Sequence, residues 1–173
     1  MKAATFFAVC TALFLTPTAH AQTLGQPDPA LVEQAKALVA DSIFTRLNAD
    51  QADALAEWVT DQTHSDASGV TRMQQLSQFQ SQFRMIAASG PSNPFGEMDG
   101  FDLLQQSSLP GTDRYFRLTY MTYHDELPLV WEFHFYARPD GGLSMPYLQF
   151  SGQNPFTYLS TPDMLIERYY DLY

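Results

Sequence analysis

Residues 113–151 read DRYFRLTYMTYHDELPLVWEFHFYARPDGGLSMPYLQFS, and this stretch decides the fold. Apolar and polar side chains alternate along it with the period of two that is typical of β-strands. Asp125-Glu126 and the segment 139–142 (Pro-Asp-Gly-Gly) interrupt the alternation with turn-forming residues. A similar alternation begins at Phe101 and stops at the turn 109–112. The sequence therefore predicts an antiparallel meander of four strands, over about 101–108, 113–124, 127–138 and 143–151.

The two hairpin turns also predict the register of the strands. A two-residue turn at Asp125-Glu126 places Tyr120 opposite Trp131, and the loop at 139–142 places Trp131 opposite Phe150. Both turns gather apolar side chains on one face, which we expect to be the core. That face carries Phe116, Leu118, Tyr120, Thr122, His124, Leu127, Leu129, Trp131, Phe133, Phe135, Leu148 and Phe150.

The opposite face of the predicted sheet carries the ionisable side chains. It consists of Tyr115, Arg117, Thr119, Met121, Val130, Glu132, His134, Tyr136, Met145, Tyr147 and Gln149. On it, Arg117, Glu132 and His134 form a cross-strand cluster framed by Tyr and Met. Charged and aromatic residues ordinarily decorate the solvent face of an antiparallel sheet, so solvation is the simplest interpretation. Ligand contact and acid–base catalysis are the alternatives.

Helical periodicity precedes the strands. Asp28 and Pro29 are a helix-start signal, and apolar residues recur at three- and four-residue spacing to about Leu47. Similar patterns predict helices over about 52–60 and from Val70 to Ser89-Gly90-Pro91. A short last helix is expected after Thr161-Pro162-Asp163, and its aromatic tail is expected to dock on the domain. The alternative is an exposed aromatic patch, which would indicate a partner site.

Residues 1–21 have the anatomy of a secretory signal peptide. Met1-Lys2 is a positive start, residues 3–15 are mostly apolar, and Ala19-His20-Ala21 is a small-x-small cleavage site. The apolar run is shorter than the roughly 20 residues of a membrane span. We therefore expect an exported protein, periplasmic or secreted, with a polar leader at 22–29 and a single domain over 30–173.

The charge balance argues against two classes of partner. Cleavage after Ala21 removes Lys2 and no acid, which leaves eight basic and nineteen acidic residues and a net charge of −11. Such a field repels nucleic acid and anionic membranes. Cys10 lies in the signal peptide, so the mature chain has no disulfide. His64 has no second histidine at metal-ligand spacing, and we expect no metal and no cofactor.

Helices followed by a curved meander, with the aromatic third strand Leu129 to Tyr136, the turn at 139–142 and the closing strand Met145 to Phe150, resemble the NTF2-like (cystatin-like) α+β superfamily. The similarity is greatest to small exported bacterial members without an assigned function. It implies helices that wrap a concave sheet and often leave a cone-shaped cavity, where some members isomerise or dehydrate substrates and many only bind. Tyr120 and His124 are the titratable groups on that face, which lacks an Asp/His pair.

The leading hypothesis is an exported, non-catalytic binding or accessory domain that takes a small hydrophobic ligand or a protein partner. The alternative is a small-molecule isomerase or lyase that uses a pocket in the cone. We assign no catalytic residue. The expected ligand-binding residues are Arg117, Tyr120, His124, Trp131, Glu132, His134 and Tyr147.

Overall fold

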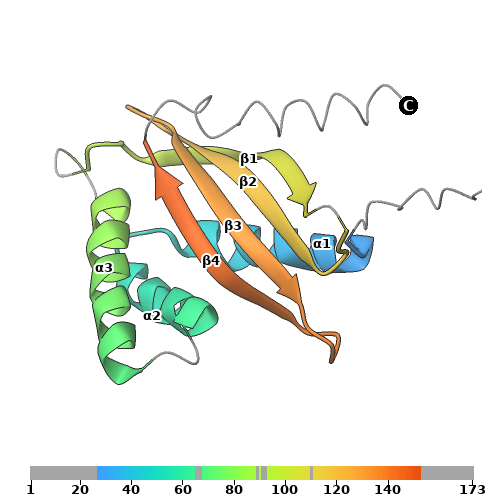
Figure 1. Cartoon of the computed structure of the whole chain (residues 1–173). Helices are drawn as coiled ribbons and strands as arrows, with labels where there is room; N and C mark the ends of the chain where they lie inside the picture. Colours follow the sequence, from blue (N-terminus) through green and yellow to red (C-terminus); the bar gives the residue numbers. More distant parts are fainter. Residues whose placement is uncertain (1–26, 65–67, 89, 91–92, 110, 153–173) are drawn as a thin grey trace, which may run out of the picture.

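A computed structural model describes residues 27–64, 68–88, 90, 93–109 and 111–152 of the chain. The predicted signal peptide, most of the leader and the predicted C-terminal helix lie outside these residues. The fold class is α+β, as predicted: three α-helices precede a four-stranded antiparallel sheet of order β1-β2-β3-β4 (Figure 1). The helical segments are α1 (Pro29–Ala37), η1 (Leu38–Ile43), η2 (Phe44–Arg46), α2 (Ala52–His64) and α3 (Gly69–Ala87). The strands are β1 (Met98–Ser108), β2 (Tyr115–His124), β3 (Leu129–Ala137) and β4 (Leu143–Ser151).

The first helix begins where the sequence predicts. Asp28 accepts a hydrogen bond of 2.9 Å from the backbone N–H of Ala30, and Pro29 takes the first helical position. The single helix predicted to Leu47 is instead three successive segments, because the chain widens to a π-helix at η1 and tightens to a 3-10 turn at η2.

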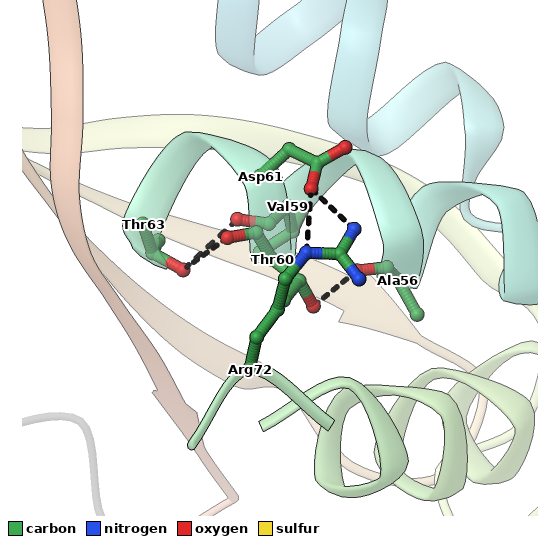
Figure 2. Close-up of polar contacts among 6 residues, drawn as sticks. All are labelled: Ala56, Val59, Thr60, Asp61, Thr63 and Arg72. Carbon is green, nitrogen blue, oxygen red and sulfur yellow. Dashed lines mark hydrogen bonds and ion pairs between the residues drawn. The ribbon is translucent and has the colours of Figure 1, made fainter. Parts of the chain in front are cut away.

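Helix α2 continues to His64, four residues past its predicted end, and is tied to α3 (Figure 2). The Thr60 and Thr63 hydroxyls donate to carbonyls one turn back, at 2.7 Å to Ala56 and 2.9 Å to Val59. Arg72 of α3 donates from Nε to Asp61 Oδ1 at 3.1 Å. The hydroxyls bond within α2, whereas the Arg72–Asp61 ion pair links the two helices near their connection (Figure 2).

The predicted register of the central strands is confirmed. Tyr120 lies opposite Trp131, and Trp131 lies opposite Phe150. The face that carries these residues packs against the helices: Phe44 from η2 and Phe83 from α3 join Trp131 in one buried cluster. The core therefore lies between the helical layer and this face, which we call the inner face.

Two residues depart from the predicted faces, and Met145 is the first. His134 pairs with Tyr147 but Tyr136 pairs with Ser144, so one extra residue of β4 is accommodated between these pairs. This β-bulge turns Met145 inward, where it is 1% exposed and belongs to the core. The prediction of Met145 on the outer face, opposite the inner face, is wrong.

Leu127 is the second departure. It was predicted on the core face, but it precedes β3 and is 49% exposed. The backbone N–H groups of Asp125 and Glu126 donate to the carbonyls of Glu97 and Phe95, at 3.1 and 2.9 Å. Because these bonds hold the connection against the segment before β1, the hairpin is not closed by its own strands alone, and β3 starts at Leu129.

Candidate functional site

Tyr120 and Trp131, two of the predicted ligand-binding residues, are core residues. Tyr120 is 4% exposed and Trp131 is fully buried. The ring of Phe44 meets both edge-on, with centroids 5.5 Å from Tyr120 and 5.6 Å from Trp131. Burial raises the pKa of Tyr120 to about 12, so its phenol stays protonated at neutral pH. The space beside these two rings is filled by aromatic side chains, which supports a packing role.

His124 is held in a polar chain at the end of β2. Its Nε2 lies 3.0 Å from Thr122 Oγ1 and its Nδ1 lies 3.2 Å from the carbonyl oxygen of Gly96. The carbonyl can only accept, so Nδ1 carries the proton and Nε2 accepts from the Thr122 hydroxyl. Burial lowers the pKa of His124, which favours this neutral form. The imidazole thus links β2 to the segment before β1.

The other predicted site residues do meet, on the outer face of the sheet. His134 Nε2 lies 2.6 Å from Glu132 Oε1, and Tyr115 Oη lies 2.9 Å from His134 Nδ1. Arg117 places Nη1 3.9 Å from the second oxygen of Glu132. The Glu132 carboxylate can only accept, so His134 donates from Nε2 to Glu132, and with this tautomer Nδ1 accepts a hydrogen bond from the Tyr115 hydroxyl. We call Tyr115, Arg117, Glu132 and His134 the outer-face cluster.

The pKa values of two members of the outer-face cluster, Glu132 and Tyr115, are shifted in opposite directions. The hydrogen bond from His134, aided by the charge of Arg117, lowers the pKa of Glu132 despite its burial. Burial, with the Glu132 charge, raises the pKa of Tyr115. The cluster at neutral pH therefore combines a carboxylate with a protonated phenol. The side chains of Glu132, Arg117 and His134 are 13%, 20% and 24% exposed.

Tyr147 borders this cluster from β4. Its ring centroid lies 4.7 Å from that of His134, and its hydroxyl donates to Gln149 Oε1 at 2.6 Å. Arg117, Glu132, His134 and Tyr147 are thus brought together, whereas Tyr120, His124 and Trp131 lie in or near the core. The structure therefore divides the seven predicted residues into two groups with different surroundings.

Sequence reasoning missed two features. Tyr115 was placed on the correct face but not among the site residues, because it reaches His134 diagonally from the position opposite Tyr136. Phe101 and Leu103 form an apolar patch at the inner-face edge of β1, 39% and 37% exposed. The alternation of apolar residues along β1 was the signal for that patch.

Neither the search for metal-ligand groups nor the comparisons with known proteins assign a function to these residues. Within the part of the chain that the structure describes, no three His, Cys, Asp or Glu side chains are grouped so that they could hold a metal ion. No helix among the same residues is long and apolar enough to cross a membrane. Searches against protein-family models, curated proteins and solved structures found no match to this chain.

Proposed function

We propose that this chain is an exported binding or accessory domain without catalytic activity of its own, and that it makes contact through the outer face of the sheet. The observation that carries the proposal is the mutual engagement of the outer-face cluster. Each ring nitrogen of His134 has a partner, and both Glu132 oxygens face a cationic or donor group. Such a network fixes a polar, charged surface in one geometry, which favours recognition over proton transfer to a substrate.

The surroundings of the inner-face residues support the same proposal. Tyr120 and Trp131 pack against Phe44, and His124 is engaged by Thr122 and Gly96. These side chains stabilise the fold, so we propose no acid–base couple on the inner face. The NTF2-like assignment, with helices on a curved sheet and a short C-terminal helix, remains part of the proposal, and so does export. The order of helices and strands supports the assignment; the sequence of residues 1–21 supports export.

Native mass spectrometry of the mature protein, purified gently from its export compartment, tests this function. We expect an additional mass, either an adduct of a small molecule or a protein partner. We expect that mass to be lost in Arg117→Ala and retained in Arg72→Ala, which removes a half-buried arginine that pairs with Asp61 on the helices. The proposal is contradicted if the natural protein shows only the mass of the bare chain. It is also contradicted if both variants retain the additional mass to the same extent.

One observation favours the second candidate, an isomerase- or lyase-type enzyme. Tyr115, His134 and Glu132 are connected hydroxyl to imidazole to carboxylate, at 2.9 and 2.6 Å. This order lets an imidazole accept a proton while a carboxylate stabilises its charge. Turnover of a small molecule by the purified protein, abolished in both Tyr115→Phe and His134→Ala, would establish catalysis in place of binding alone.

A further inference from the structure

Part of the outer face, from the central strands to the β1 edge, is buried, although the helices pack on the inner face. Val130, Thr119 and Gln105 are 0%, 2% and 3% exposed. Val130 is not a member of the cluster that joins the helices to the sheet. Thr119 and Glu132 are paired, as are Gln105 and Thr119, so these residues form adjoining positions on one surface. A solvated sheet face ordinarily leaves such side chains accessible to water.

The burial of the Gln105 side chain is the strongest indication that further polypeptide lies on the outer face. Gln105 lies on β1, an edge strand, so the sheet flanks it on one side only. Its side-chain Oε1 is nevertheless buried and accepts no hydrogen bond from the described residues. A buried amide oxygen without a donor is costly, and native structures contain few of them. This position therefore marks a surface over which further polypeptide is expected.

From this we infer that the chain's own C-terminal segment, residues 153–173, lies across the outer face and covers Val130, Thr119 and Gln105. The end of β4 supports this occupant. Ser151, the last residue of β4, is paired directly with Val130. The chain therefore leaves the sheet beside the most deeply buried outer-face residue, and one reversal of direction brings it onto that face.

The length and composition of the segment fit the surface. It has 21 residues, among them five aromatic residues and the predicted amphipathic helix that begins at Thr161-Pro162-Asp163. The four strands span about 14 Å at their ordinary spacing. The eight residues 153–160, which precede the predicted helix, reach roughly 26 Å when extended. Leu165 and its apolar neighbours can pack on Val130 and Met121. Asp163, Glu167 and Asp171 provide carboxylates for a face that carries Arg117.

Tethering favours this segment over an external occupant. A segment joined to β4 by a short linker is present at an effective concentration of about 1 mM, well above that of a second copy or a partner in dilute solution. The inference concerns the isolated chain and stands whether or not the outer-face cluster binds a partner. If the proposed function also holds, a partner at that cluster must displace the segment or share the face with it.

Photo-cross-linking of the full mature chain tests the inference. p-Benzoylphenylalanine replaces Met121, a half-buried outer-face residue of β2, and cross-linked peptides are mapped by mass spectrometry after irradiation. The matched control places the same group at Met73, which is 69% exposed on α3. We expect the yield of monomeric cross-links into residues 161–173 to be at least about tenfold higher from position 121 than from position 73.

A second placement guards against a local folding defect at Met121. Ser107→p-benzoylphenylalanine puts the probe on β1, the strand farthest from β4 in the sheet, opposite Arg117. We expect cross-links into 161–173 from this position as well. Cross-linked dimers as the main product would assign the face to a second copy. A folded monomer with cross-links from neither position 121 nor 107 into the segment would also overturn the inference.

Discussion

The indole of Trp131 donates from Nε1 to Oγ1 of Thr122 at 2.9 Å, inside the core between β2 and β3. Both side chains are fully buried. The Thr122 hydroxyl in turn donates a hydrogen bond to His124 Nε2, at 3.0 Å, and His124 Nδ1 donates to the carbonyl oxygen of Gly96. Each donor in this series of hydrogen bonds, from Trp131 through Thr122 and His124 to Gly96, therefore has an acceptor as long as His124 is neutral. The largest ring of the core is thus connected to a titratable group at the sheet end.

Protonation of His124 is expected to destabilise the fold. Burial lowers the pKa of His124 in the folded state below its ordinary value of 6.5, so the unfolded chain binds the proton first. Stability from this group is complete above about pH 6.5 and decreases as the pH falls toward the lower folded pKa. Urea unfolding at about pH 7.5 and about pH 5 should show a larger loss for the natural chain than for His124→Gln. Equal losses in the two proteins would refute the role of His124.

Removal of the Thr122 hydroxyl should cost more than removal of a hydroxyl that bonds within a helix. Thr122→Val leaves the buried Trp131 N–H without an acceptor, and we expect a loss of about 1–3 kcal/mol in the free energy of unfolding. Thr60→Val is the matched control, because Thr60 is equally buried and donates to the Ala56 carbonyl, which also serves the helix. We expect it to cost less than about 1 kcal/mol. Similar values for both variants, measured by chemical denaturation, would contradict this account.

Most of the central sheet could be predicted from the sequence because side chains alternate with a period of two and the turns fix the pairing. Tyr120, Trp131 and Phe150 lie in one row across the sheet as expected. Met145 could not be placed, because a bulge adds one residue without a visible break in the pattern. Leu127 was misplaced because the turn residues Asp125 and Glu126 donate backbone hydrogen bonds to the carbonyls of Glu97 and Phe95, which are distant in sequence. These bonds determine the turn.

The candidate site was predictable as a face but not as a network. The register put Arg117, His134 and Glu132 on neighbouring strands, and the structure confirms those neighbours. The bond between Tyr115 and His134 depends on rotamers and on a diagonal reach, which pairing does not determine. Val130 is buried on the outer face, and alternation alone predicts a solvated side chain at this position.

The β4 bulge makes opposite predictions for two adjacent residues. Met145 is 1% exposed in the core, whereas the next residue, Pro146, is exposed. Met145→Ala should therefore cost about 2–5 kcal/mol of unfolding free energy. Pro146→Ala should change it by less than about 0.5 kcal/mol, as expected for an exposed position away from the core. A regular β4 without the bulge would direct Pro146 inward and Met145 outward, and denaturation of the two variants would then give the reverse order.

The carboxylate of Glu132 should stabilise the fold in a pH-dependent way. The His134 hydrogen bond, with the charge of Arg117, lowers the folded pKa of Glu132 below its ordinary value of 4.5. Its contribution is therefore complete above about pH 4.5 and is lost as the pH falls through the lower folded pKa. We expect Glu132→Gln to cost about 1–3 kcal/mol at neutral pH, because the hydrogen bonds of the carboxylate are half-buried, and to cost less at acidic pH.

Asp53→Asn is the control, because it removes an exposed partner of Arg84. Solvent screens this exposed ion pair, so the effect of Asp53→Asn should be much smaller at neutral pH. Denaturation curves that give the two variants the same cost at neutral pH would show that the outer-face cluster adds no more stability than an ordinary surface ion pair.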